Sequence, residues 1–214
     1  MNAVTKSCKH IMKLLELFKG TGSIAKVFER EGWEVSSLDI DPKSEADITA
    51  NILDWDYTEY EPVHFDAIWG SPPCTEYSKA KTRGKRNLQL ADSIVLKLLE
   101  IIDYFKPRVW WFENPHSGLL PKRLIIAHLP PPYMVSYCMY GMSYRKHTAL
   151  WTNVAFEPLA CNKNCGSYFN GKHIARAQGD QFKTKSLYVI PERLCEAIFA
   201  ATREHLDSDM KNQT

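Results

Sequence analysis

Hydrophobic residues are grouped along this chain in short runs of two kinds, one with the spacing of strands and one with the spacing of helices. An apolar segment over residues 13–18 ends in a glycine-containing turn, after which Ile24, Val27 and Phe28 recur at helical spacing. Further strands are expected at residues 33–38, 47–52, 65–69 and 108–112, a late strand pair at 133–140 and 148–152, and helices at 90–105 and 191–205. Strands that alternate with helices in this way predict an α/β fold with a doubly wound, mostly parallel sheet.

Ligands of such sheets bind beyond the carboxyl ends of the strands, and the first candidate there is the turn from Phe18 to Gly22. Its glycines allow close approach of the backbone to a ligand, and the following helix begins with free amide donors. Asp39, at the end of the next strand, suits ribose hydroxyls. Because a third glycine is missing, a nucleoside ligand is favoured over a dinucleotide. The alternative is a purely structural turn.

Two more polar motifs follow strands. In Gly70-Ser71-Pro72-Pro73-Cys74 the prolines fix the backbone and present the cysteine at the edge of the sheet. A thiol held there is a candidate nucleophile, although a lone cysteine is more often a small core residue. The tripeptide Glu113-Asn114-Pro115 places a carboxylate after the strand 108–112. Its alternative interpretation is a solvated carboxylate.

These three motifs, in this order, resemble those of the cytosine-5 DNA methyltransferases, particularly the compact phage- and virus-type members. The likeness covers residues 12–152 and resumes weakly in the last helix. It implies a Rossmann-like class I methyltransferase fold and S-adenosylmethionine-dependent methylation of cytosine carbon-5 in DNA, on an extruded base. Cys74 would add covalently to carbon-6 of the base, and Glu113 would hold a proton against ring nitrogen-3.

The remaining roles follow from the resemblance alone. It assigns cofactor binding to Phe18, Gly20, Thr21, Gly22, Asp39, Ile40, Asn51, Ile52 and Pro72. Asn51 stands where the family usually has aspartate, and Pro115 where it usually has valine. Asn114 and Pro115 are expected to position Glu113. Residues 143–147 fall where the family has a glutamine-arginine motif, of which only Arg145 is matched, and Arg145 is therefore expected to support the target base.

The overall charge does not favour nucleic-acid binding, since 27 Lys and Arg residues face 25 Asp and Glu residues, for a formal net charge of +2. Affinity for a polyanion must come from a local patch. Such a patch follows Cys74 directly and consists of Lys79, Lys81, Arg83, Lys85 and Arg86. We expect this loop to contact phosphates, the alternative being a solvated lysine-rich loop.

The chain has six cysteines and no secretion signal, a combination that favours metal binding or catalysis over disulfides. Cys161, Cys165 and His173 have the spacing Cys-x3-Cys-x7-His, and Cys138 could supply a fourth ligand to zinc. Because the surrounding segment has too few apolar residues for a core, a structural metal would compensate. The alternatives are a chance grouping and a core role for Cys138.

The predicted organisation is a flexible leader (1–11), a catalytic methyltransferase domain (12–153), a reduced target-recognition or zinc module (154–185), a helix that completes the catalytic domain (186–206) and a disordered tail (207–214). Full-length relatives have a larger recognition region, so a short or relaxed sequence preference is expected. Candidate base contacts in the small module are Lys172, His173, Arg176 and Gln178.

Neither a signal peptide nor a membrane span is evident in the sequence. A monomeric, cytoplasmic, non-secreted protein of a prokaryote or an infected host cell is expected. Three alternatives for function stay open: RNA as the substrate, a catalytically degenerate nucleic-acid-binding protein, and an amino-methyltransferase. The last is disfavoured by Cys74, because those enzymes have an aromatic residue after Pro-Pro.

Overall fold

The computed structural model describes residues 10–175 and 187–212. Its strands are β1 (Lys13–Leu17), β2 (Glu34–Asp39), β3 (Ile48–Thr49), β4 (Ala67–Gly70), β5 (Val109–Pro115), β6 (Tyr133–Ser136), β7 (His147–Thr152), β8 (Tyr168–Phe169) and β9 (Lys172–His173). Its α-helices are α1 (Ser23–Arg30), α2 (Leu88–Phe105) and α3 (Glu192–Asn212), and short 3-10 turns include η5 (Tyr137–Tyr140). Most of the predicted leader, the predicted contacts Arg176 and Gln178, and residues 213–214 lie outside the described residues.

Seven strands form one mixed sheet in the order β3-β2-β1-β4-β5-β7-β6. The first five pair in parallel, whereas β7 is antiparallel to both of its neighbours. The strand order reverses between β1 and β4, the place where ligands of doubly wound sheets bind. The predicted fold class is confirmed.

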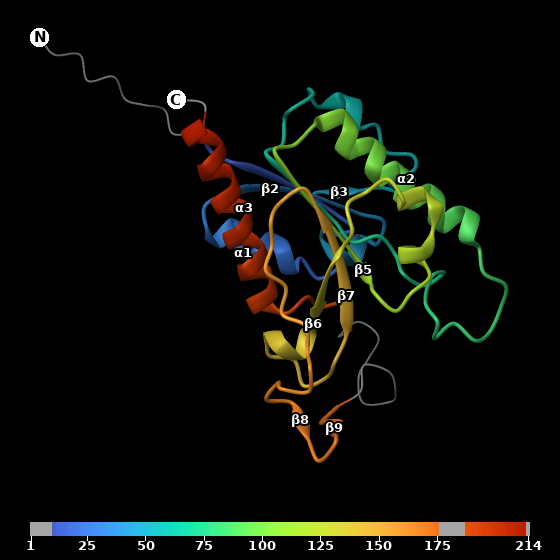
Figure 1. The fold of residues 1–214 in the computed structure, drawn as a ribbon. Helices are drawn as coiled ribbons and strands as arrows, with labels where there is room; N and C mark the ends of the chain where they lie inside the picture. Colours follow the sequence, from blue (N-terminus) through green and yellow to red (C-terminus); the bar gives the residue numbers. More distant parts are fainter. Residues whose placement is uncertain (1–9, 176–186, 213–214) are drawn as a thin grey trace, which may run out of the picture.

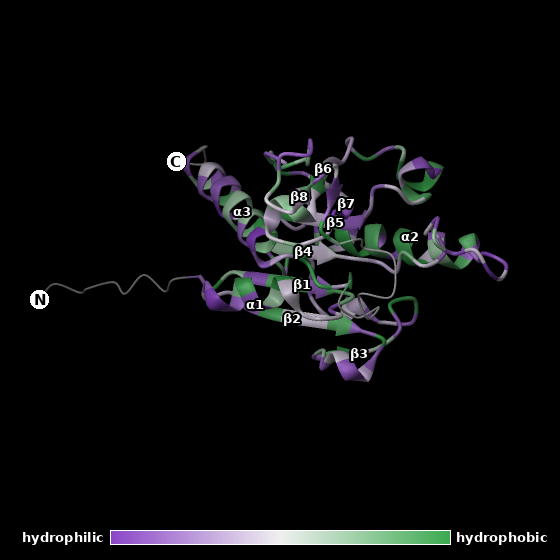
Figure 2. Ribbon diagram, turned by 90° about the horizontal axis from the view of Figure 1, so that it is seen from below, coloured by the Kyte–Doolittle hydropathy of each residue, from purple (hydrophilic) through white to green (hydrophobic). Residues whose placement is uncertain are grey.

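Helices cover both faces of this sheet, α1 and α3 on one side and α2 on the other (Figure 1). Alternate residues of a strand point to opposite faces of the sheet and pack against different helices. In β1, Leu14 joins the cluster around α1 and α3, while Leu15 and Leu17 join the cluster around α2. Figure 2 shows α3 becoming hydrophilic toward its C-terminal end.

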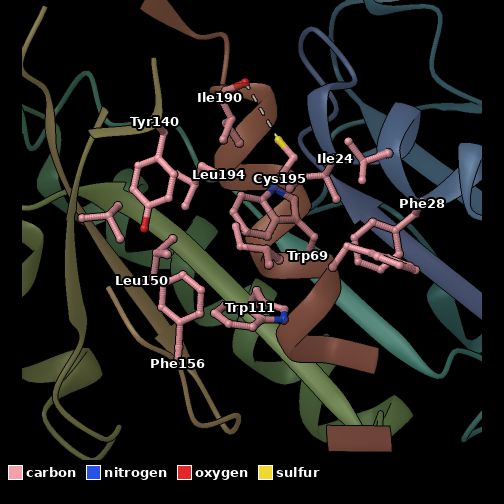
Figure 3. Close-up of a cluster of buried hydrophobic side chains, with 14 of the residues drawn as sticks. Ile24, Phe28, Trp69, Trp111, Tyr140, Leu150, Phe156, Ile190, Leu194 and Cys195 are labelled. Atoms are coloured by element: carbon pink, nitrogen blue, oxygen red, sulfur yellow. Dashed lines mark hydrogen bonds between the residues drawn. The ribbon is translucent and has the colours of Figure 1, made fainter. Parts of the chain in front are cut away.

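The layer of α1 and α3 is held by large aromatic side chains. Trp69 from β4 lies beside Leu194 and Cys195, and Trp111 from β5 lies near Phe156 (Figure 3). The indole nitrogen of Trp111 donates a hydrogen bond of 2.9 Å to Thr202 Oγ1 of α3, which satisfies a buried donor. The C-terminal helix is therefore an integral part of the layer that covers this face of the sheet.

Three parts of the chain differ in their secondary structure from the sequence-based prediction. Residues 137–140 form the turn η5 rather than a continuation of the strand, because the chain leaves the sheet after Ser136. Residues 113–115 belong to β5, since pairing with β7 extends that strand. The helix α3 continues through residues 207–212, so the predicted tail is wrong there. Its i,i+4 ion pairs, Arg203 with Asp207 and His205 with Asp209, are typical of an exposed helix.

The segment after β7 contains no long element among the described residues before α3. Its regular structure there is the two-stranded hairpin β8–β9, which lies away from the helices (Figure 1). Within the described part of the chain, no helix has the length and apolar character needed to span a membrane.

Candidate active site

Cys74 and Glu113 are brought together by the parallel pairing of β4 and β5. Gly70, the last residue of β4, is in register with Phe112 of β5, so the chain segments that follow both positions emerge at the same edge of the sheet. Cys74 is partly exposed and Glu113 is buried, and both side chains line one cavity. A thiol and a carboxylate thus face the same space.

A side-chain hydrogen bond from Asn114 fixes the diproline loop that carries Cys74. The side-chain amide of Asn114 donates a hydrogen bond of 3.0 Å to the Pro72 carbonyl oxygen, and Asn114 is fully buried. Its neighbour Glu113 lies on the opposite face of β5 at the cavity. One dipeptide therefore supplies the carboxylate and holds the loop of the thiol.

The glycine turn forms the adjoining wall. Phe18, Gly20 and Gly22 all have positive φ values (62°, 53° and 61°), so the turn is sharp and leads directly into α1. The Asp39 carboxylate accepts one hydrogen bond on each oxygen, from the amides of Gly20 and Asp41, both at 2.8 Å. Since each carboxylate oxygen has a second lone pair, Asp39 can still accept from ligand hydroxyls.

The cavity has a volume of about 320 Å³. Its wall is formed by Glu16, Phe18, Lys19, Gly20, Thr21, Ser23, Asp39, Asp41, Lys43, Ser44, Ser71, Pro72, Pro73, Cys74, Thr75, Glu113, Pro115, Lys146, Tyr188 and Ile190. This volume is in the range of small-molecule sites. The cavity extends from the glycine turn to Cys74, so a ligand on the turn and a reactant at the thiol can share it.

A buried carboxylate lies at the base of the glycine turn. Glu16 of β1 is 2% exposed and accepts a hydrogen bond of 3.2 Å from the amide of Ala25, in the first turn of α1. Burial raises its pKa to about 8, although the amides of Ala25 and Ile24 oppose this shift. The acidic group therefore stays protonated at neutral pH unless a cation enters the cavity.

Lys146 supplies the positive charge nearest to Glu113. Its Nζ lies 3.8 Å from Glu113 Oε1, 4.7 Å from the ring centroid of Tyr137, and donates to the Leu187 carbonyl oxygen at 3.4 Å. Tyr137 is fully buried and its hydroxyl donates to Glu113 Oε1 at 3.5 Å. The carboxylate is thus held between an ammonium group and a phenol.

These charges act on the thiol. Burial raises the pKa of Cys74, and the Glu113 carboxylate raises it further, whereas Lys146 lowers it. Because its pKa is raised, Cys74 is mostly protonated in the free protein. Only the thiolate form of a cysteine is nucleophilic. A ligand that neutralises the charge of Glu113 would favour the thiolate.

Comparison with known proteins identifies the family. The model of the C-5 cytosine-specific DNA methylases matches residues 12–123. A probable DNA (cytosine-5)-methyltransferase of Frog virus 3 (isolate Goorha) is 37% identical over 166 residues, which cover 70% of this chain and 75% of the relative. The chain belongs to the C-5 cytosine-specific DNA methylases.

Two solved structures share the fold of this methylase. A putative DNA modification methyltransferase encoded within an E. coli prophage matches with a TM-score of 0.50 and 14% identity, over 68% of this chain and 49% of that one. The Entamoeba histolytica methyltransferase EhMeth matches with a TM-score of 0.52 and 15% identity, over 71% and 57%. The chain therefore spans only about half the length of these two proteins.

Most residues predicted to bind the cofactor of a methylase lie on the cavity, namely Phe18, Gly20, Thr21, Asp39 and Pro72. Gly22, Ile40, Asn51 and Ile52 are not on its wall. The Asn51 side chain closes its own turn through hydrogen bonds with Asp54 and the Leu53 amide. The cofactor-binding role of the whole set stays a prediction.

Arg145 does not line the cavity, and the structure places Lys146 there instead. The Arg145 side chain is exposed, whereas Lys146 is partly buried beside Glu113. Both residues lie in the segment just before β7, and of the two only Lys146 is on the cavity wall. The cation at this site is therefore one position later than the motif indicates.

The five cations after Cys74 divide into two groups. The Lys81 ammonium forms an ion pair with Glu76 at 2.5 Å, and Arg86 donates to the carbonyl oxygens of Glu76 and Lys81 at 2.7 and 2.9 Å. These two shape the loop. Lys79, Arg83 and Lys85 are exposed, and within the described residues none of them has an ion pair, so these three can meet phosphates.

The four predicted metal ligands meet in space. The ligand atoms of Cys138, Cys161, Cys165 and His173 all lie within 4.8 Å of one another. Cys138 comes from η5 rather than from a strand.

Among the residues that sequence reasoning missed are Glu16 and Lys146 of the methylase cavity, and Tyr137, which contacts Glu113. After its first residue, Lys13, the strand β1 has one charged residue, Glu16, among leucines. A lone acidic residue in an apolar strand just before the glycine turn could have been recognised in the sequence. Tyr137 and Lys146 have no such signal, because their role depends on the pairing of β6 and β7 against β5.

Replacement of Glu16 by Gln should remove a pH dependence of stability. The folded-state pKa of about 8 exceeds the ordinary value of 4.5, so the folded chain holds a proton that the unfolded chain releases between these pH values. The free energy of unfolding should therefore fall as pH rises from 4.5 to 8, by up to about 1.4 kcal/mol per pH unit. In Glu16→Gln this component disappears, which urea unfolding from pH 5 to 8.5 would measure.

The matched control is Glu59→Gln, which removes an exposed carboxylate and should keep the wild-type slope. Parallel pH profiles for Glu16→Gln and wild type would contradict the assignment of this titration to Glu16.

Replacement of Lys146 by Met should make Cys74 less reactive at neutral pH. Lys146 is the cation that lowers the pKa of the thiol, so its removal raises that pKa further. Each unit of increase costs roughly a tenfold decrease in thiolate fraction below the pKa. Alkylation of Cys74 with iodoacetamide, followed by mass spectrometry of its peptide from pH 6 to 10, should show a profile displaced to higher pH.

Lys146→Arg keeps the charge and should keep the profile near that of wild type. Lys79→Met removes an exposed lysine beyond Cys74 and serves as the control for net charge. An unchanged profile in Lys146→Met would exclude an electrostatic effect of this lysine on the thiol.

Proposed function

We propose that this chain transfers a methyl group from S-adenosylmethionine to carbon-5 of cytosine in DNA, through a covalent adduct with Cys74. One observation carries the proposal: the thiol of Cys74 and the carboxylate of Glu113 line the same cavity as the glycine turn and Asp39. A nucleophile, an acid and a nucleoside-binding turn in one space are what this reaction requires. Family membership supports the same chemistry.

The cavity suits a cationic nucleoside. Asp39 has free lone pairs for ribose hydroxyls, and the glycine turn lets the backbone approach the ligand. Glu16, buried at the same wall, would ionise beside a positive charge. S-Adenosylmethionine, which carries a sulfonium and an ammonium group, supplies an electrophilic methyl group when bound.

The protein's own groups then act on the pyrimidine. The Cys74 thiolate forms a bond to carbon-6 of cytosine, and the electron pair displaced toward the ring is stabilised by the proton that Glu113 holds at nitrogen-3. This makes carbon-5 nucleophilic. After methylation, water accepts the proton of carbon-5, Glu113 takes back the proton at nitrogen-3, and expulsion of the thiolate restores the aromatic ring. Lys146 would keep Glu113 oriented and oppose its effect on the thiol.

Two observations favour DNA as the substrate over RNA. The matching family is described as acting on DNA, and the Frog virus 3 relative is named a probable DNA methyltransferase. The exposed cations Lys79, Arg83 and Lys85 follow Cys74 in the chain and can contact the phosphates around an extruded base in either polymer.

A 5-fluorocytosine oligonucleotide should trap the adduct. Fluorine replaces the proton that must leave carbon-5, so the bond between Cys74 and carbon-6 persists after methylation. With S-adenosylmethionine present, we expect a denaturation-resistant complex with duplex or single-stranded DNA, with Cys74 in the modified peptide. Gel shift under denaturing conditions and peptide mass spectrometry would detect it.

Cys74→Ser should give no adduct, whereas Cys195→Ser, which changes a buried thiol outside the cavity, should trap normally. Trapping on an RNA oligonucleotide alone would overturn the choice of DNA. No adduct on either polymer, in a chain that binds both, would support the degenerate binding protein instead.

Combined replacement of Lys79, Arg83 and Lys85 by Gln should weaken DNA binding and its salt dependence. Each neutralised phosphate adds about −0.9 to the slope of the logarithm of affinity against the logarithm of salt concentration. The slope should therefore become shallower by about 0.9 for each phosphate that the variant no longer neutralises, as fluorescence anisotropy at several salt concentrations would measure. Lys106→Gln, before the amino end of β5, should leave the slope unchanged. Equal slopes for the triple variant and wild type would remove this loop from the interface.

A further inference from the structure

Three thiols and one imidazole form a compact cluster outside the catalytic cavity. Cys138 belongs to η5, Cys161 and Cys165 to the loop after β7, and His173 to β9. The three cysteines are between 5% and 9% exposed. Among the described residues, the apolar neighbours packed against them are Met139 and Tyr168, so this part of the chain has almost no hydrophobic core of its own.

The distances in the cluster match a tetrahedral zinc site. His173 Nε2 lies 3.4 Å from Cys161 Sγ and 3.3 Å from Cys165 Sγ. With zinc–sulfur and zinc–nitrogen bonds of about 2.3 and 2.0 Å, a tetrahedron places sulfur and nitrogen roughly 3.5 Å apart. All four ligand atoms lie within 4.8 Å of one another, close enough for one ion to reach each of them. Three thiolates and one histidine are a closed structural set.

The backbone around the cluster is arranged for thiolates. The amide of Lys163 donates to Cys161 Sγ at 3.4 Å, and Lys163 has a φ of 68°, as a tight turn around a ligand requires. The hairpin β8–β9 turns at Asn170 and Gly171, both with positive φ, the pattern of a two-residue turn. This turn brings His173 back beside Tyr168 and to the thiols.

The same segment is tied to the wall of the catalytic cavity. Ser136 Oγ accepts a hydrogen bond from the Cys161 amide at 2.9 Å and contacts His147 Nδ1 at 2.8 Å. The next residue after Ser136 is Tyr137, whose hydroxyl reaches Glu113, and the one after that is the ligand Cys138. A metal ligand and a contact of Glu113 are therefore consecutive residues of η5.

We propose that Cys138, Cys161, Cys165 and His173 bind one structural zinc ion, which attaches the segment 159–175 to η5 and thereby fixes Tyr137 against Glu113. The ion replaces a hydrophobic core that this segment lacks. The positioning part of the proposal rests on the proposed function of Glu113, whereas the metal site does not. An experiment that contradicts the metal site would therefore leave the proposed role of Glu113 untouched.

Metal analysis of the full chain, purified without added chelator, tests the site. Inductively coupled plasma mass spectrometry should give about one zinc per chain for wild type. Cys161→Ser and Cys165→Ser should retain less than about a fifth of that amount, and Cys195→Ala, which removes a buried thiol outside the cluster, should keep all of it. A well-folded wild-type chain without metal, or with two of the cluster thiols joined in a disulfide, would overturn the proposal.

Cobalt substitution does not depend on the folding of a variant. Wild type stripped by a chelator under reducing conditions and refilled with cobalt(II) should show the visible bands of tetrahedral cobalt and a near-ultraviolet thiolate-to-cobalt absorption. Zinc should displace this spectrum. Octahedral cobalt bands, or no bound cobalt, would exclude a site of three thiolates and one histidine.

Hydrogen exchange with and without metal tests the coupling to the cavity. Removal of zinc should reduce amide protection in residues 159–175 and also in residues 136–148, which carry Tyr137 and Lys146. Protection in β1 and β2 should stay the same, because β4 and β5 separate these strands from β6 and β7 in the sheet. A decrease in protection confined to residues 159–175 would overturn the positioning role of the ion.

Discussion

The site depends above all on one buried hydrogen bond, from the Asn114 amide to the Pro72 carbonyl oxygen. A polar group in a dry interior is costly unless it is paired, so this contact strongly favours one arrangement of the diproline loop over others. The prolines already restrict the backbone, and Asn114 fixes what freedom remains. The position of the Cys74 thiol is thereby fixed relative to β5, the strand that also carries Glu113.

Hydrogen bonds between neighbouring segments also fix the side of the cavity formed by the glycine turn. Ser71, at the start of the diproline loop, donates to the Phe18 carbonyl oxygen at 3.3 Å, and Asp39 accepts from the Gly20 amide. The segments that follow β1 and β4 and the C-terminal ends of β2 and β5 are thus tied to one another. Because parallel strands end at one edge of the sheet, these segments together form a large part of one cavity wall.

The fold and the motif residues could be predicted because their signals are local. The turn from Phe18 to Gly22, the diproline loop and the acid at Glu113 each lie where a run of strand residues ends. Lys146 could not be predicted, since its approach to Glu113 depends on how β7 pairs against β5. The spacing of the other proposed zinc ligands can be recognised in the sequence, but the approach of Cys138 to them also depends on the fold. Hydrophobic periodicity does not detect the last turns of α3, because the mostly exposed residues 207–211 need no apolar side chains.

In the cavity, the charge of Glu113 opposes the ionisation of Cys74. Ionised Glu113 raises the pKa of Cys74, yet the thiol must lose its proton to react. Lys146 lies 3.8 Å from the carboxylate and counteracts this effect in the free protein. In the proposed reaction, Glu113 would share a proton with ring nitrogen-3 of bound cytosine, and its negative charge would be reduced at the moment when the thiolate is needed. The substrate itself would thus complete the activation of Cys74, and a thiol that is unreactive in the empty cavity is protected from unwanted alkylation and oxidation.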